Sequence, residues 1–397
     1  MVFDDIIIGS GLSALAVAIG LPRGRRILVL AGPAEGRLIE YPQARGVPCQ
    51  YLGHGGLGNY WHGVIPFLGD QSVESSSRED FKALLAEFYP AAAADLSVTE
   101  PALFIPRAPI RPQPHWAGLQ QSRNLTLTPG SASLITLQDN GAVVEAEGER
   151  HEGRRVWCCA GALETPRLLA RSLGEAMATG FVSDHVIVSL GLAPRTQEIV
   201  PNVRRGGDGY WLKPMTCPER DILMTARPAR FSFARLDSGI ERRAVFGLPT
   251  RSILGRLMKA PDPGLISEAL FNKFGLFPQA AAYNIYAQLR VRDAYALDVA
   301  NAHFTVRQEA ILEATDNARQ IAAKSLPGMQ PSRRRELYIP GIHLHRTVDK
   351  QAALSAGILS ETSPLQIADA SILDDIGGAH HSFGMMLSAW KRARNTG

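Results

Sequence analysis

The chain has 397 residues, of which 45% are hydrophobic and 20% charged, and its formal net charge at pH 7 is only +4. This length exceeds that of a usual single domain, so we expect two closely joined domains around a large buried core. The small net charge, with basic residues only in short clusters, argues against a nucleic-acid partner.

Three further features concern the compartment. The first residues lack the basic and apolar regions of a signal peptide, and no apolar run reaches the roughly 18 residues of a membrane span. The four cysteines are too few for a disulfide scaffold, and the adjacent Cys158 and Cys159 are expected to be buried, unreactive thiols. We therefore expect a cytoplasmic protein without a transmembrane segment.

The amino-terminal residues have the pattern of a strand, a tight turn, a helix and a second strand. Residues 3–8 (FDDIII) are largely apolar and β-branched, as in a buried parallel strand. Residues 9–14 (GSGLSA) match GxGxxA and lead into the apolar residues 15–19, and residues 26–30 (RILVL) form the second strand. This arrangement predicts a dinucleotide-binding site.

The residues of this motif have separate physical roles. Gly9 permits the tight turn, Gly11 lets the backbone approach a pyrophosphate, and Ala14 lets the helix pack closely on the strand. The helix begins at Leu12 and Ser13, so its N-terminal amides and partial positive charge face the phosphates. We expect all five residues to contribute to the cofactor site.

The end of the second strand departs from the usual pattern. An Asp or Glu at this point commonly binds the ribose hydroxyls of the adenosine, whereas this chain has Ala31, followed by Gly32 and Pro33. Glu35 lies a few residues further on and is the candidate that reaches back to the ribose. A dinucleotide is still expected, with altered anchoring of its ribose.

Four further segments resemble parts of one enzyme family. They are residues 54–63 (HGGLGNYWHG), similar to GGxSxxWxG; residues 159–169 (CAGALETPRLL), similar to (A/C)AGAxxTPxLL; residues 184–185 (DH); and residues 367–371 (IADAS) with 378–386 (GAHHSFGMM), similar to VVDAS…GxNPTxxxM. With the glycine motif, they follow the order and rough spacing of the glucose–methanol–choline (GMC) oxidoreductases, which bind FAD. The resemblance is specific to the family and leaves the individual enzyme open.

The resemblance also implies which residues approach FAD. The glycine-rich segment would lie along the flavin, and the later segments would reach the cofactor from the ends of strands. The residues implied to bind FAD are Gly55, Gly56, Asn59, Trp61, Ala160, Gly161, Asp369, Ala370, His380 and Ser382. In some relatives a histidine of the glycine-rich segment is bonded covalently to the flavin. Tyr60 occupies that position here, so we expect FAD to be bound non-covalently.

The residues from about 382 onward have the spacing of an amphipathic helix. Phe383, Met386, Leu387 and Trp390 recur at i, i+3, i+4 and i+7, and Ser382 is a suitable N-cap. The partial positive charge at the N-terminus of this helix would face the pyrimidine edge of the flavin. Negative charge accumulates there on reduction, so this placement favours reduction.

Histidines are the candidate catalytic residues. Removal of the hydroxyl proton from an alcohol suits histidine, because its pKa lies near working pH and its neutral form accepts a proton. The family resemblance implies a pair, His/His or His/Asn, in front of flavin N5. The alignment of Gly378 and Met386 gives His380 one of these positions, and His343, four residues before Thr347, matches the other.

Two other histidines are alternatives for this chemistry. Arg346 stands where the family has glycine, so His345 is an alternative to His343, and His381 replaces the proline of the last motif. A metal site on these histidines is not expected, because no acidic ligand or cysteine lies at close spacing beside them.

The middle of the chain predicts a second structural unit. Residues 187–192 and 283–289 are strand-like and fit an antiparallel sheet that roofs the flavin, and residues 309–326 form an amphipathic helix. Residues 249–279 are apolar and helix-prone, which indicates a core or lid helix pair, or a hydrophobic mouth for a lipophilic substrate. The proline-rich residues 101–114 predict an extended connection over the surface.

The sequence thus predicts an α/β fold in which a Rossmann-like FAD-binding domain is joined to a substrate domain built on an antiparallel sheet plus helices. The expected FAD domain is discontinuous (1–100, 150–190 and 335–397), and residues 101–149 and 191–334 form the substrate or cap domain. The expected function is removal of a hydride from an alcohol, or from a related C–H, of a small molecule. The electron acceptor, oxygen or another carrier, stays open. The alternatives are a GMC-like lyase that keeps FAD as a structural group, and a binding protein that has lost FAD.

Overall fold

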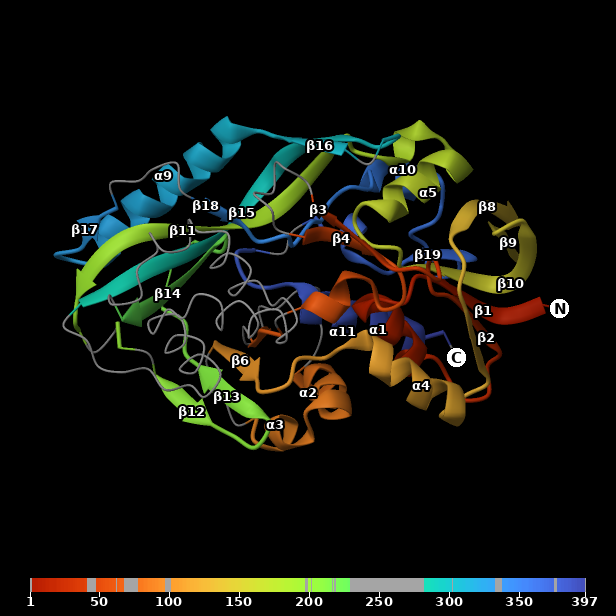
Figure 1. The fold of residues 1–397 in the computed structure, drawn as a ribbon, viewed down its shortest axis with the longest axis horizontal. Coiled ribbons are helices and arrows are strands. Elements are labelled where there is room, and N and C mark those ends of the chain that lie inside the picture. The colour runs from red at the N-terminus through yellow and green to blue at the C-terminus, as the bar shows by residue number, and fades with distance from the viewer. Residues whose placement is uncertain are drawn as a thin grey trace.

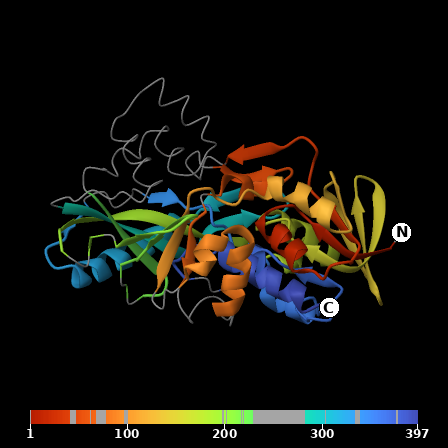
Figure 2. The ribbon, with the colours of Figure 1, turned by 90° about the horizontal axis from the view of Figure 1, so that it is seen from below.

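The computed structural model describes residues 2–40, 48–61, 63–67, 78–96, 101–196, 199–200, 202–215, 217, 219–228, 282–301, 303–332, 338–374 and 377–396. The described elements form two main sheets at opposite ends of the long axis, as Figure 1 shows. The amino-terminal strand belongs to one of them, and the other is antiparallel. Figure 2 shows the same arrangement from below.

The amino-terminal sheet is mixed. Its strands are β1 (Val2–Ile8), β2 (Ile27–Leu30), β7 (Leu125–Thr128), β8 (Ala132–Gln138), β9 (Gly141–Ala146), β10 (Glu149–Cys158) and β19 (Leu365–Ile367). Their order is β7-β2-β1-β10-β9-β8, and β19 pairs with the second half of β10, beyond β9. The pairs β1–β10, β1–β2, β2–β7 and β10–β19 are parallel. β1 and β2 are nearly continuous apolar runs because helices cover both faces of the sheet at this point.

The parallel strands end together at one edge of this sheet. Ile8 pairs with Cys158, and Cys158 pairs with Ile367. The amide of Cys159 donates to the carbonyl of Ile8 at 2.9 Å, and the amide of Ala368 donates to the carbonyl of Cys158 at 2.9 Å. Three segments that are far apart in sequence therefore leave the sheet side by side, which is where ligands bind in open parallel sheets.

Helices cover the two faces of this sheet. α1 (Leu12–Gly20) and α11 (Ser382–Arg394) pack together on one face, where a Cβ on Gly20 would lie only 2.4 Å from the carbonyl oxygen of Trp390. α5 (Glu164–Leu173) and α10 (Lys350–Ser355) pack against the other face. The predicted helix from residue 382 is confirmed, but Ser382 is its first residue and not its N-cap. The cap position is His381, and no side chain caps the helix.

The second main sheet confirms the strands predicted in the middle of the chain. Its strands are β11 (Phe181–Pro194), β14 (Ile222–Pro228), β15 (Ala282–Asp298), β16 (His303–Val306), β17 (Gln330–Pro331) and β18 (Tyr338–Pro340). β15 pairs with β11 and β14, and all strand pairs of this sheet are antiparallel. The helix predicted at 309–326 is α9 (Gln308–Ser325), which packs its Ile311, Ala318 and Ala322 on this sheet. The apolar segment 249–279 lies outside the described residues.

Smaller elements complete the fold. They are the hairpin β3 (Arg37–Glu40) and β4 (Pro48–Leu52), the sheet of β5 (Ile65–Phe67), β6 (Ala102–Pro106), β12 (Val203–Arg205) and β13 (Gly209–Leu212), the helices α2 (Arg78–Phe88), α3 (Pro90–Ala94) and α4 (Pro112–Ser122), and the 3₁₀ turns η2 (Gly56–Tyr60), η4 (Glu175–Met177) and η6 (Ala370–Ile372). The expectation of an extended connection at 101–114 is wrong. This segment contains β6 and the first turn of α4, where Pro112 suits the first helical position because its φ is fixed and no amide is needed there.

The sheets do not follow the predicted domain boundaries in every detail. Residues 101–149 were assigned to the substrate domain, yet β7, β8 and β9 belong to the amino-terminal sheet. The division of the chain into two domains stays a prediction.

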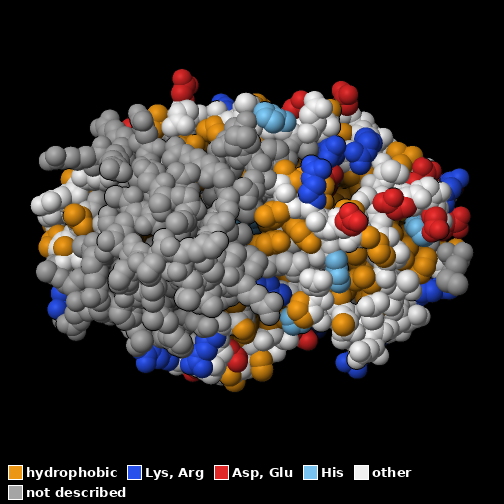
Figure 3. All heavy atoms as spheres, viewed as in Figure 1, with side chains coloured by type: hydrophobic (Ala, Val, Ile, Leu, Met, Phe, Trp, Pro, Cys, Tyr) orange, Lys and Arg blue, Asp and Glu red, His pale blue; other side chains and the backbone are white. Residues whose placement is uncertain are grey.

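Within the described ranges, no helix combines the length and the apolar character that crossing a membrane requires. On the face shown in Figure 3, hydrophobic side chains gather beside the grey region, next to Lys and Arg.

Candidate functional site

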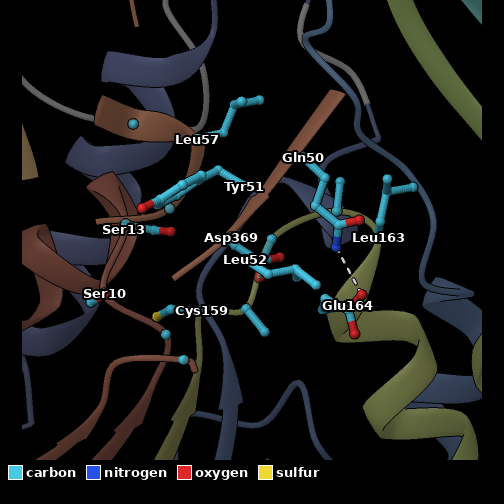
Figure 4. A pocket seen from close by; sticks show the side chains of 18 of the residues that line it. Ser10, Ser13, Gln50, Tyr51, Leu52, Leu57, Cys159, Leu163, Glu164 and Asp369 are labelled. Atoms are coloured by element: carbon cyan, nitrogen blue, oxygen red, sulfur yellow. Dashed lines mark hydrogen bonds between the residues drawn. The ribbon is translucent and has the colours of Figure 1, made fainter. Parts of the chain in front are cut away.

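A cavity of about 400 Å³ lies at the carboxyl ends of β1, β2 and β10 (Figure 4). Its walls come from the β1–α1 turn, the end of β2, β4 with η2, residues 130–132, the β10–α5 turn, residues 341–344 and the first turn of α11. Its volume is within the range of small-molecule and cofactor pockets. The cavity thus joins the expected nucleotide turn and two of the candidate histidines in one space.

The β1–α1 turn depends on a glycine and a serine. Gly9 has φ +104°, and a Cβ there would lie 2.3 Å from the carbonyl oxygen of Cys159, so only glycine fits. The hydroxyl of Ser10 donates to the carbonyl of Ala31 at 3.0 Å and accepts from the amide of Gly55 at 2.8 Å. Ser10 therefore ties the turn to the end of β2 and to the glycine-rich segment. Sequence reasoning missed it because it occupies a variable position of the motif.

At other glycines the missing side chain leaves open space toward the cavity. A Cβ on Gly11 would meet only the carbonyl oxygen of Gly55, at 3.8 Å, and a Cβ on Gly161 would meet nothing within 4 Å. Gly56 also lines the cavity, with φ +55°. The first turn of α1, with Leu12 and Ser13, lines the same space and carries no acidic side chain, so its N-terminal partial charge is not neutralised. This cradle fits a pyrophosphate group.

Some of the predicted cofactor residues lie outside the cavity lining. Ala14 is fully buried within α1, where it permits close packing. Gly55 and Asn59 shape the η2 turn, because Gly55 has φ +90° and the side-chain amide of Asn59 donates to the carbonyl of His54 at 2.9 Å. Glu35 is exposed and does not line the cavity. Those that do line it, besides the glycines above, are Gly9, Leu12, Ser13, Trp61, Ala160, Asp369, Ala370 and Ser382.

Asp369 is engaged within the protein. Its Oδ2 accepts from the amide of Gly161 at 2.8 Å and from the hydroxyl of Thr165 at 2.5 Å, and its Oδ1 accepts from the amide of Ser371 at 3.0 Å. Burial raises the pKa of this carboxyl, and these hydrogen bonds oppose the increase. The family resemblance implied that it binds FAD. In the structure it joins the β10–α5 turn to the residues after β19.

Five histidines, His185, His343, His345, His380 and His381, pack against one another, and we call them the histidine cluster. Neighbouring rings within it have centroids 5.2–5.8 Å apart. His343 and His381 line the cavity, and His185 and His345 are fully buried. His380, which was also predicted to bind the cofactor, is partly exposed and lies outside the cavity lining. All four histidines predicted from the sequence meet here. His185 had been noted only as part of the DH motif.

Hydrogen bonds assign the proton in two of these rings. Nε2 of His185 lies 2.8 Å from the carbonyl oxygen of Gly377, and Nδ1 of His345 lies 2.9 Å from that of His343. Because a carbonyl oxygen only accepts, each of these nitrogens carries the hydrogen. The other nitrogen of each ring, Nδ1 of His185 and Nε2 of His345, is unprotonated in the neutral form and buried without a hydrogen-bond partner.

Three members of the cluster, His185, His345 and His381, stay uncharged at neutral pH. Burial lowers the pKa of His185 to about 4, and burial together with the neighbouring His185 lowers that of His345 to about 3. Burial and the nearby rings also bring the pKa of His381 well below its usual value. Among the described residues, no group of His, Cys, Asp or Glu side chains has the arrangement of a metal site.

Asp184 holds the loop that carries two of these histidines. Its Oδ1 accepts from the amides of His343 at 2.7 Å and His185 at 2.8 Å, and its Oδ2 accepts from the hydroxyl of Tyr295 at 3.0 Å and the amide of Ile342 at 3.4 Å. Burial raises the pKa of this carboxyl to about 7, against the effect of these hydrogen bonds. Asp184 is a positioning residue that fixes Ile342, at φ +53°, and the His343 backbone beside β11.

Arg346 holds the same loop from its other side. It has φ +58° at the position where the family pattern has glycine, a conformation that costs a non-glycine residue about 1 kcal/mol or more. Its guanidinium forms ion pairs with Asp293 and Asp374, the second at 2.9 Å. These contacts stabilise a backbone conformation that glycine adopts freely.

Comparisons with known proteins support the fold. No protein-family model matches the chain, and no curated protein matches its sequence. Among solved structures, the chain is similar to pyridoxine 4-oxidase from Mesorbium loti, with a TM-score of 0.50, 13% identity and 99% of each chain covered. It is also similar to a fungal aryl-alcohol oxidase, with a TM-score of 0.50, 12% identity and 98% of each chain covered. At these identities the likeness establishes the fold alone, and it confirms the predicted α/β class with its antiparallel second sheet.

The neutral cluster predicts a loss of stability in acid. Well above pH 6.5, His185, His345 and His381 are neutral in both the folded and the unfolded state, but at lower pH only the unfolded chain protonates them. Each of them should therefore decrease the free energy of unfolding by about 1.4 kcal/mol per pH unit as pH falls from 6.5 toward about 4. Asp184 and Asp369, whose pKa values are raised by burial, contribute with the opposite sign and reduce the net slope. Urea unfolding at pH 7.5, 6.5, 5.5 and 4.5 measures this slope.

A single substitution separates the cluster from other acid-sensitive groups. His345→Gln keeps a donor for the His343 carbonyl and removes one titrating ring, so the slope should decrease by about one proton. His151→Gln, on β10 and away from the cavity, is the matched control and should leave the slope unchanged. Identical slopes for the wild type and His345→Gln would contradict the prediction.

Proposed function

We propose that this chain is an FAD-dependent oxidoreductase that removes a hydride from the carbinol carbon of a small alcohol, or from a related C–H group. One observation carries the proposal: a single cavity is lined both by the glycine cradle and by His343 and His381. Such a cavity can hold a dinucleotide and a substrate in contact with groups that take up protons. The family motifs in the sequence support this proposal, and the shared fold is compatible with it.

The lining residues fit FAD. Gly11 and the first turn of α1 would hold the pyrophosphate, and Gly56, Trp61 and the first turn of α11 would border the flavin. Bound there, FAD would supply the acceptor for a hydride. The fold of the two similar structures, one a pyridoxine oxidase and one an aryl-alcohol oxidase, makes pyridoxine and benzyl alcohol sensible first probes.

Within this proposal His380 removes the hydroxyl proton. Its ring is the partly exposed member of the cluster and lies 5.2 Å, centroid to centroid, from that of His343, which would hydrogen-bond the substrate oxygen. His185 and His345 stay neutral, so they do not repel a proton that arrives on His380. His381 lines the cavity and is the alternative base, and its lowered pKa makes it a weaker one.

The visible spectrum of the purified chain tests the function. A yellow protein that is bleached anaerobically by pyridoxine or benzyl alcohol supports the oxidoreductase. A yellow protein that no alcohol of a broad panel bleaches supports the lyase, and a colourless protein that takes up no FAD supports the binding protein. The identity of the electron acceptor then follows from reoxidation of the bleached protein with and without oxygen.

Gly11→Val should abolish FAD retention without unfolding the chain. The protein leaves open space at this Cα, and its φ of −75° is allowed for any residue, so the valine fits the fold but fills the cradle. Flavin content per folded molecule is the measurement. Gly9→Val, whose side chain meets the Cys159 carbonyl, is the contrasting variant and should fail to fold. Full flavin occupancy in Gly11→Val would place the cofactor elsewhere.

FAD should be released intact by acid. Tyr60, not a histidine or cysteine, stands at the position that some relatives use for a covalent bond. Precipitation with trichloroacetic acid should leave all the yellow colour in the supernatant. Colour in the pellet would contradict non-covalent binding, with His54 and His62 the first suspects; of these, His62 lies outside the described residues.

His380→Ala should slow anaerobic bleaching by about 10²–10⁴-fold, the usual contribution of general-base catalysis, while FAD stays bound. A higher pH should partly restore the rate, because a more ionised alcohol needs the base less. Stopped-flow bleaching at two pH values, together with the thermal midpoint, separates this role from packing. His381→Ala is the matched neighbour and should retain most of the rate. A His380→Ala rate within about threefold of wild type would rule out this assignment.

A further inference from the structure

The cavity wall at the end of β2 offers no side chain to a ribose. Ala31 presents a methyl group, its amide donates to the carbonyl of Thr128 at 2.9 Å, and its carbonyl accepts from Ser10. Gly32 and Gly130 exchange two backbone hydrogen bonds, at 3.1 and 2.8 Å. The polar backbone groups at this point are therefore already engaged, and ribose hydroxyls need another acceptor.

One face of α5 forms the opposite wall. Glu164, Arg167, Leu168 and Arg171 are spaced at i, i+3, i+4 and i+7, and all four line the cavity. At the far end of this stripe Arg171 donates to the carbonyl of Ser133 at 3.2 Å, close in sequence to the Gly130 that pairs with the end of β2. The stripe therefore runs from the β10–α5 turn toward the wall that Ala31 leaves without an acid.

Two acidic side chains occur in the described lining, and they differ in how far they are exposed. Asp369 is 2% exposed and accepts from Gly161, Thr165 and Ser371 through both oxygens. Glu164 has a side chain 23% exposed. The remaining sequence candidate, Glu35, is outside the lining.

Two neighbours hold the Glu164 carboxylate toward the cavity. Its Oε1 accepts from Nε2 of Gln50 at 2.7 Å, the contact drawn in Figure 4, and from Nη1 of Arg167 at 2.9 Å. Its Oε2 accepts only the longer contact from the same Arg167 nitrogen, at 3.2 Å, within the part of the chain that the structure describes. A carboxylate oxygen has two lone pairs, so Oε2 has capacity for one more donor.

We infer that Glu164 binds the adenosine ribose of the dinucleotide, in place of the acid that Ala31 replaces; this rests on the proposed FAD function. Its carboxylate accepts a hydrogen bond from the 2′-hydroxyl through Oε2, and Gln50 and Arg167 position it. Residues 131–132 and Arg171 border the adenine beyond, and Gly11 borders the pyrophosphate on the other side. A negative carboxylate also disfavours a ribose that carries a 2′-phosphate.

The test compares two ligands and two substitutions in the full chain. The ligands are FAD and FAD whose adenosine half is 2′-deoxyadenosine, titrated into flavin-free protein by quenching of flavin fluorescence. Glu164→Gln should bind FAD about 10–100-fold more weakly than wild type, as expected for loss of a charged acceptor. Glu35→Gln removes an equal charge outside the lining and should bind FAD as wild type does.

The deoxy ligand separates direct contact from a structural effect. Wild type should lose affinity for it, whereas Glu164→Gln should bind FAD and the deoxy ligand nearly equally. If Glu164 had only a structural role, Glu164→Gln would bind FAD and the deoxy ligand more weakly than wild type by the same factor, and that result would overturn the inference. Equal FAD binding by Glu164→Gln and wild type would also overturn it. The thermal midpoint without flavin shows whether the variant is folded, and Glu164→Asp supplies a folded second variant. Wild-type protein that takes up no FAD would instead overturn the proposed function.

Discussion

The pairing of β1 with β10 brings two turns into such close contact that much of the site depends on it. A Cβ on Gly9 would overlap the carbonyl oxygen of Cys159, and β19 pairs on the other side of β10. This contact aligns the β1–α1 turn, the β10–α5 turn and the residues after β19 at one sheet edge. Without it, Gly11, Gly161 and Asp369 would not share a cavity wall. The shape of the glycine-lined cavity wall thus depends on the register of these strands, and Gly9 is required because the register brings the two turns so close.

The histidine cluster illustrates a different constraint. Rings that would repel each other as cations lie with their centroids 5.5–5.8 Å apart, and burial keeps them neutral. Asp184 makes this arrangement possible, because it satisfies the backbone amides of His185 and His343 where the loop leaves β18. A polar but uncharged wall results. The charge that faces the cavity then comes from the N-termini of α1 and α11 and from the side chains of α5.

Local patterns predicted the parts of the site that depend on local geometry. The turn from Gly9 to Ala14 requires a positive φ at Gly9 and a close approach of its backbone to the Cys159 carbonyl. Only glycine meets both requirements, so a short sequence motif is enough to recognise the turn. The meeting of His343 with His380 followed from family motifs and not from spacing. By contrast, the inclusion of His185 depends on the pairing of β11 with β18, in which Ile187 pairs with Ile339, and no local pattern encodes a contact of this range. Glu164 stands at a variable position of its motif, and Ser382 lost its predicted cap role because the backbone turns into the helix one residue earlier.

The placement of β19 and α11 has a consequence for biosynthesis. β19 completes the sheet beside β10, and α11 covers α1, so the amino-terminal nucleotide unit exposes apolar surface until residues from the far end of the sequence arrive. Contacts of this range make folding slow and leave intermediates that tend to aggregate. The nascent chain would therefore emerge from the ribosome with the apolar face of α1 uncovered until α11 has been synthesised.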